Sequence, residues 1–76
     1  MSRERSTDVV AEMVANVIEV SVAVGDRVEV GDQVLMLESM KMEIPVLAEQ
    51  AGTIDKVRVD VGDVVQEGDV LLTVRH

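Results

Sequence analysis

The chain has 76 residues and a formal net charge of −8 at pH 7, and it contains no aromatic residue and no cysteine. A chain of this length forms one small domain with a thin core, so we expect a module without a catalytic pocket of its own. The acidic balance and the missing aromatic side chains argue against nucleic-acid binding, and the missing cysteines exclude disulfides and thiolate metal sites.

Residues 1–8 are mostly polar and charged, and they predict a flexible N-terminal segment ahead of a domain at residues 9–75. Valine, which packs well on a pleated surface, occurs eighteen times and favours strands. Valines alternate with other residues over residues 20–24 and again over residues 57–61, as in half-buried strands. Four Gly-Asp steps predict turns, because glycine accepts positive φ and aspartate hydrogen-bonds nearby backbone. They are Gly25-Asp26, Gly31-Asp32, Gly62-Asp63 and Gly68-Asp69.

The chain contains an internal repeat. A shift of 37 residues places residues 9–12 on residues 46–49, and it carries both early Gly-Asp steps onto the later ones with the same spacing. Turns at such short intervals imply about four short strands in each copy, and no segment shows a helical stripe. The sequence therefore predicts an all-β domain, built as two packed sheets or a flattened barrel.

The repeat also locates one connection. Residues 38–44 join the last strand of the first copy to the first strand of the second. If a pseudo-twofold axis relates the copies, the symmetry mate of this connection is the place where the two termini lie. The turn at residues 38–44 should therefore project from the end of the domain opposite the termini.

That turn carries the residues Glu38, Ser39, Met40, Lys41, Met42, Glu43, Ile44 and Pro45. A lysine at a hairpin tip is accessible to a modifying enzyme, which must deprotonate the amine before it can attack an activated acyl group. The chain has one other lysine, Lys56, and it falls in a strand pattern. Proline cannot donate to a strand ladder, so Pro45 predicts an edge or a bulge directly after the hairpin.

Met40-Lys41-Met42 preceded by Glu38 resembles the acceptor motif of biotin carboxyl carrier proteins, and the Gly-Asp steps and Gly52 match the same family. The likeness covers roughly residues 9 to 75, and it is strongest to the small stand-alone biotinylated proteins of mycobacteria and other actinobacteria. It implies a flattened barrel of two four-stranded antiparallel sheets. It also implies biotin, joined through an amide to Lys41.

The resemblance further implies a non-catalytic carrier. Biotin protein ligase would attach the biotin, with Met40, Met42 and Glu38 recognised by the ligase or by partners. The tethered biotin would then carry a carboxyl group from a biotin carboxylase to a carboxyltransferase. Contacts with these subunits would be transient, so we expect a monomer. No signal peptide and no membrane span of roughly 20 apolar residues is evident, which predicts a cytoplasmic protein without metal, membrane or nucleic-acid partners.

The sequence departs from the family where Ala15 stands in the place that Gly52 takes in the second copy. This turn must be made differently, and Asn16 is the candidate for a left-handed conformation. Other functions stay open. The chain could be biotinylated for storage or regulation without serving a carboxylase, or it could be a lipoyl carrier, although lipoyl acceptors typically read Asp-Lys-Ala. A purely structural β-module would have to treat the motif around Lys41 as coincidence.

Overall fold

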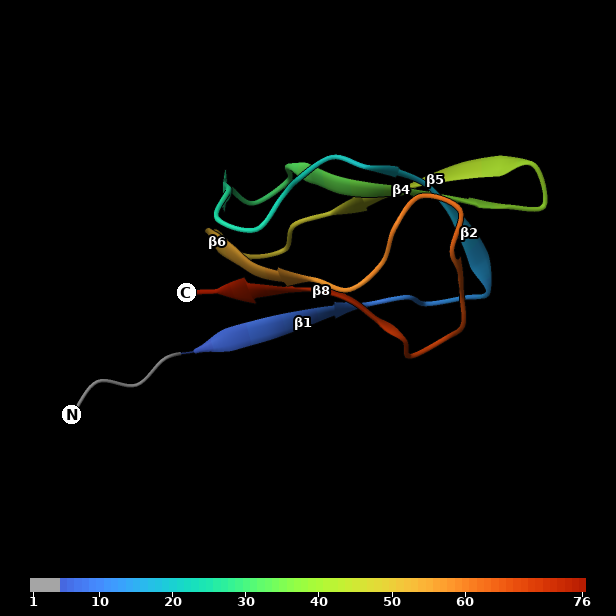
Figure 1. The fold of residues 1–76 in the computed structure, drawn as a ribbon. Helices are drawn as coiled ribbons and strands as arrows, with labels where there is room; N and C mark the ends of the chain where they lie inside the picture. Colours follow the sequence, from blue (N-terminus) through green and yellow to red (C-terminus); the bar gives the residue numbers. More distant parts are fainter. Residues whose placement is uncertain (1–4) are drawn as a thin grey trace.

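The computed structural model describes residues 5–76, which form eight strands (Figure 1). They are β1 (Ser6–Val10), β2 (Ala15–Val20), β3 (Arg27–Val28), β4 (Gln33–Ser39), β5 (Met42–Leu47), β6 (Gly52–Val57), β7 (Val64–Val65) and β8 (Val70–Arg75). No helix occurs in this range, so none of it provides an apolar helix that could cross a membrane. The number and kind of elements confirm the all-β prediction.

The strands form two four-stranded sheets, with the orders β1-β8-β6-β3 and β5-β4-β2-β7. All of the strand pairs within them are antiparallel. The two sheets face each other along an elongated molecule of 46 × 20 × 17 Å (Figure 1). This arrangement confirms the flattened barrel of two four-stranded antiparallel sheets.

The structure also contains the internal repeat. The shift of 37 residues carries β1, β2, β3 and β4 onto β5, β6, β7 and β8. When the two copies are exchanged in this way, the order β1-β8-β6-β3 becomes β5-β4-β2-β7, which is the order of the other sheet. Loop contacts repeat in the same way: the amide of Ala11 donates to the carbonyl of Asp69 at 2.9 Å, and the amide of Ala48 donates to the carbonyl of Asp32 at 2.8 Å. Each sheet therefore contains strands from both copies, so neither copy has a sheet of its own.

The core lies between the sheets and consists of valine, leucine, isoleucine and alanine. Leu35 in β4 and Leu72 in β8 are both fully buried and occupy equivalent places in the repeat. With no aromatic ring to fill the interior, many small aliphatic side chains contribute, and burying each removes apolar surface from water. The buried apolar residues are Ala11, Ala15, Val17, Val28, Val34, Leu35, Leu37, Ala48, Ile54, Val59, Val65, Leu71, Leu72 and Val74.

The four Gly-Asp steps are turns, as predicted. Their glycines have φ between 91° and 100°, a range in which a Cβ would be strained. Each aspartate accepts a hydrogen bond through Oδ2 from the backbone N–H three residues earlier, for example Asp26 from Ala23 at 2.9 Å and Asp63 from Asp60 at 2.8 Å. Glycine supplies the backbone conformation and aspartate holds it, which explains why the two residues recur together.

The first strand starts earlier than the expected domain boundary. β1 begins at Ser6, so residues 6–8 pair with β8 although they fell within the expected flexible segment 1–8. The buried hydroxyl of Thr73 donates to the carboxylate of Asp8 at 2.9 Å, and this contact anchors the strand. Arg5 precedes the strand, and residues 1–4 lie outside the described residues.

The expectation for Asn16 is wrong. Asn16 lies in β2, and among residues 5–76 only Met40 and Lys41 combine positive φ with a side chain. The reason is that Gly52 does not have positive φ either. A Cβ at Gly52 would lie 2.5 Å from the carbonyl oxygen of Arg75, so this glycine permits a close approach of β6 and β8. No left-handed residue was needed in the first copy.

Candidate functional site

The predicted acceptor lysine lies in a tight hairpin between β4 and β5. Ser39 and Met42 are the last paired residues, so Met40 and Lys41 form a two-residue turn. Their φ values are 53° and 65°. Positive φ at both central residues characterises the type I′ turn, which usually takes Asn-Gly because larger side chains are disfavoured there. The turn therefore stores strain of about 1 kcal/mol or more at each of these residues.

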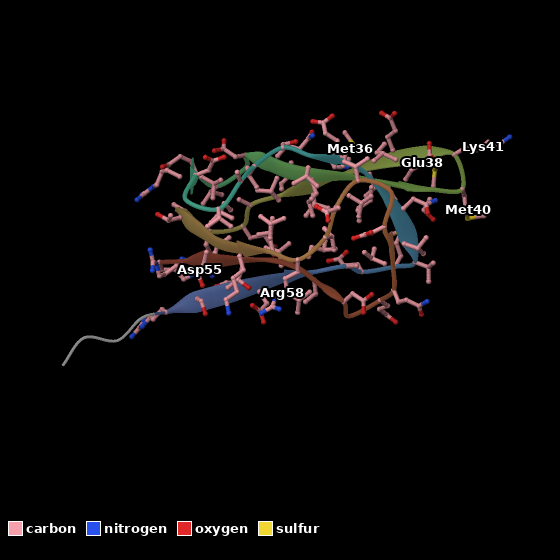
Figure 2. The ribbon with its side chains drawn as sticks, viewed as in Figure 1. Met36, Glu38, Met40, Lys41, Asp55 and Arg58 are labelled. Atoms are coloured by element: carbon pink, nitrogen blue, oxygen red, sulfur yellow. The ribbon has the colours of Figure 1, made fainter. Side chains whose placement is uncertain are left out.

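The hairpin extends from one end of the molecule, and Lys41 projects from its tip (Figure 2). The start of β1 and the C-terminus lie at the other end (Figure 1), as the repeat predicted. The Lys41 side chain is exposed, and it forms no ion pair with any of the residues 5–76. The primary amine is therefore open to an enzyme from outside the domain.

Met40 and Met42 are largely in solvent, with relative exposures of 87% and 60%. In Figure 2 Met40 points to the side of the hairpin, and Lys41 points away from the barrel. Neither methionine belongs to the core or to the partly buried residues packed against it. Filling the interior therefore does not explain them, and their thioethers are available to a partner.

Glu38 and Glu43 lie directly opposite each other one step behind the turn. Opposed residues of an antiparallel pair share one face, so the register places two negative charges side by side. Neither carboxylate forms an ion pair within residues 5–76. Like charges in this position oppose pairing, and the fold offsets that cost through the buried contacts of Leu37 on the same strand.

Pro45 lies in β5, which is an edge strand of its sheet, and it pairs with Met36 of β4. The predicted edge position is confirmed. Because proline has no N–H, it removes one donor from the exposed edge and limits pairing with other chains.

Two hollows on the described surface do not include Lys41. One of about 620 Å³ is bordered by residues including Arg58 and Asp63, and one of about 280 Å³ lies between β1 and β5. The reactive amine is at a projecting tip, away from both.

Sequence reasoning assigned no role to His76, and the structure gives it one in joining the end of the chain to the start of β1. Its backbone N–H donates to the carbonyl of Arg5 at 2.8 Å. Its ring lies with Nε2 2.6 Å from the hydroxyl of Thr7 and Nδ1 3.1 Å from the carbonyl of Ala51. The equivalent position in the first copy is Ser39, beside the acceptor turn. The same place in the repeat thus closes the chain at one end and presents the lysine at the other.

Comparison with known proteins agrees with this geometry. Over 39 residues the chain is 64% identical to the "Biotinylated protein TB7.3" of Mycobacterium tuberculosis. The matched segment covers 51% of this chain and 55% of the relative. Over 35 residues it is 51% identical to the "Biotin/lipoyl attachment protein" of Bacillus subtilis, which is 46% of this chain and 48% of the relative. The chain thus spans about half the length of the curated relatives that it matches.

Two solved structures share the fold over nearly the whole chain. A single-chain, multi-domain long-chain acyl-CoA carboxylase matches 90% of the chain with a TM-score of 0.84 and 34% identity, which is 7% of that protein. The urea carboxylase of Kluyveromyces lactis matches 97% of the chain with a TM-score of 0.86 and 31% identity, which is 6% of that protein. A family model for biotin and lipoyl domains, described as "Biotin-requiring enzyme", matches residues 5–74, and the chain therefore belongs to this biotin/lipoyl family.

Proposed function

We propose that this chain is a biotin attachment domain in which Lys41 carries biotin through an amide bond. The observation that supports the proposal best is the position of the lysine. Its exposed amine is at the tip of a strained two-residue turn, at the end of the fold opposite the start of β1 and the C-terminus. Strain of this kind persists where the surrounding structure enforces it, and it concentrates at functional sites.

The residues at the tip fit biotin. The free carboxyl group of biotin needs a primary amine to form an amide, and the chain has two lysines. Lys41 is at the tip, whereas Lys56 lies in β6 among the paired residues of a sheet. We propose that Lys41, once deprotonated inside biotin protein ligase, forms the amide with the carboxyl group. When bound, biotin supplies a ureido nitrogen that takes up and releases a carboxyl group.

The protein contributes placement. A lysine at the tip of a projecting hairpin holds its cargo on a tether, which raises the local concentration in any active site that the tip enters. We propose that the exposed thioethers of Met40 and Met42 and the carboxylate of Glu38 are the features that the ligase and later partners recognise. Contact confined to so small a tip would be brief, as a carrier that serves several active sites requires.

We further propose that the partners are a biotin carboxylase and a carboxyltransferase. The similarity to parts of two carboxylases supports this. The match covers a small fraction of each, so the rest of each carboxylase lies outside the matched domain, and we propose that separate subunits take that place for this chain. The test mixes the biotinylated chain with candidate carboxylase subunits from its host, ATP and radiolabelled bicarbonate. Label transferred to the chain supports the carrier role, and no transfer with any candidate favours storage or regulation.

Intact mass tests the attachment itself. The parent chain, a Lys41→Arg variant and a Lys56→Arg variant are produced with biotin and an active biotin ligase. We expect one biotinyl increment on the parent and on Lys56→Arg, and none on Lys41→Arg. An unmodified parent in the presence of active ligase overturns the proposal.

The name of the Bacillus subtilis relative supports a second candidate, lipoyl attachment at the same lysine. The mass measurement decides between the two, because the lipoyl and biotinyl increments differ. Expression with both ligases and both acids present shows which group Lys41 accepts.

A further inference from the structure

The methionines beside the acceptor lysine are unusually exposed. Met40 has a relative exposure of 87% and Met42 of 60%, compared with 41% for Met13, while Met36 is half-buried on β4. Apolar side chains in solvent need an explanation when they gather at one place. Recognition explains why the thioethers are there, but it leaves open what else this exposure permits.

The composition makes the methionine sulfurs the main targets of oxidation. The chain has no cysteine, tryptophan or tyrosine and one histidine, so thioethers are its most readily oxidised groups. The methionines in described positions differ in access, and the two most accessible are the neighbours of Lys41. A two-electron oxidant therefore meets Met40 and Met42 before any other reactive group of residues 5–76.

We propose that Met40 and Met42 are a site of reversible oxidation by peroxides, and that this oxidation controls whether Lys41 is accepted for biotinylation. The inference rests on the proposed function. In the reaction the thioether sulfur attacks one peroxide oxygen, the O–O bond breaks, and the proton of the transferred oxygen passes to the leaving oxygen. The products are a sulfoxide and water, or a sulfoxide and an alcohol when the oxidant is an alkyl hydroperoxide. The sulfur loses two electrons and the peroxide gains them. A thiol-dependent methionine sulfoxide reductase reverses the change.

The sulfoxide would act on recognition and leave the fold intact. Oxidation turns a flexible apolar side chain into a polar, chiral one. Neither methionine contributes to the core, so the barrel is not disturbed. The Lys41 amine is chemically unchanged, but the enzyme that modifies it must contact the residues on both sides of it. A hydrophobic pocket discriminates by 10- to 200-fold for a single methylene, so a sulfoxide lowers acceptance by about tenfold or more.

The charge of the domain selects the kind of oxidant. Glu38 and Glu43 lie together directly behind the turn, and the whole chain has a formal charge of −8. An anionic oxidant approaches against this field, whereas an uncharged peroxide does not. Hydrogen peroxide and small alkyl hydroperoxides are therefore the class that reacts at this site.

The experiment treats the unbiotinylated chain with hydrogen peroxide and follows each methionine by peptide mass. We expect Met40 to oxidise first, Met42 next, and Met13 and Met36 later. The initial rate of biotinylation by biotin ligase should fall about tenfold or more. It should recover after treatment with methionine sulfoxide reductase. Unfolding by urea should be unchanged, which separates recognition from damage to the fold.

Two double variants provide the matched comparison. Met13→Leu/Met36→Leu keeps the hairpin methionines and should stay sensitive to peroxide, whereas Met40→Leu/Met42→Leu should lose the sensitivity. If Met40→Leu/Met42→Leu proves a poor acceptor, the recovery of Met13→Leu/Met36→Leu with reductase decides instead, because the methionines that this variant keeps among residues 5–76 are those of the hairpin. An unchanged biotinylation rate with both hairpin methionines oxidised overturns the inference. Failure of the unoxidised parent to accept biotin overturns the proposed function itself, and the two failures are thus distinct.

Discussion

Gly52 in β6 lies so close to Arg75 in β8 that a Cβ on the glycine would be 2.5 Å from the arginine carbonyl oxygen. The side chain of Val74 would be 2.7 Å away. The backbone atom cannot move aside without disturbing the pairing of β6 with β8. The equivalent residue of the first copy, Ala15, has a Cβ and is buried. The two copies thus share strands and turns but differ in how closely one pair of strands packs.

Gly52→Ala should therefore lower the free energy of unfolding by about 1–3 kcal/mol, the usual cost of overpacking a tight site. Ala15→Gly is the comparison, and it should cost about 0.5–1 kcal/mol through backbone entropy and about 0.8 kcal/mol more through the lost buried methyl group. The chain has no aromatic fluorophore, so far-UV circular dichroism in urea is the measurement. A Gly52→Ala variant as stable as the parent would contradict the close approach of the two strands.

The turn at Met40 and Lys41 predicts a conflict between stability and the proposed function. Lys41 has a φ of 65°, which glycine adopts without strain. Lys41→Gly should raise the free energy of unfolding by about 1 kcal/mol while removing the proposed acceptor amine. Lys56→Gly, in the regular strand β6, should lower it by a similar amount. Urea unfolding of both variants checks the opposite signs, and two losses of stability would show that the turn is not strained.

The contact between Thr73 and Asp8 predicts an asymmetry between two single substitutions. Thr73 is buried at 7% exposure, and its hydroxyl donates to the exposed carboxylate of Asp8 at 2.9 Å. Asp8→Ala leaves a buried hydroxyl without its partner and should cost about 1–3 kcal/mol. Thr73→Val removes the hydroxyl and keeps the shape, so it should cost less. Urea unfolding of the two variants and of the double variant measures the coupling, and equal costs would argue against it.

The internal repeat predicts equal effects at equivalent turns. Asp26 and Asp63 accept the same hydrogen bond in the two copies, at 2.9 and 2.8 Å. Asp26→Ala and Asp63→Ala should each lower the free energy of unfolding by about 1 kcal/mol. Because the two sites share no partner, their effects should add in the double variant. Clearly unequal single effects in urea would mean that the copies support their turns differently.

Much of the fold could be predicted because local signals and the repeat agree. The Gly-Asp steps indicated turns for two independent reasons, and the structure has a turn at each of them. The position of the Glu38–Ile44 hairpin followed from the repeat alone, since the symmetry mate of that connection had to be where the termini are. Pro45 indicated an edge because proline lacks a donor, and β5 is an edge strand.

The rest depends on contacts that no local pattern records. Nothing in the sequence of Met40 and Lys41 suggests positive φ, because neither is glycine or asparagine. The ladder between β4 and β5 imposes it by leaving two residues for the turn. Gly52 permits close packing and has no positive φ, and for this reason the expectation of a left-handed Asn16 is incorrect. The contact between His76 and Thr7 joins the C-terminal residue to β1, and no pattern within a short segment could have predicted it.

That contact has a consequence for protein architecture. The amide of His76 donates to the carbonyl of Arg5, so the domain begins and ends at one place, at the pole farthest from Lys41. The chain segments that enter and leave such a domain lie side by side. The unit could therefore be spliced into a surface loop of a larger enzyme, or attached to its end, with the tip left free. A domain joined to its host by two adjacent chain segments is easy to insert, and the same domain can serve host proteins of very different size.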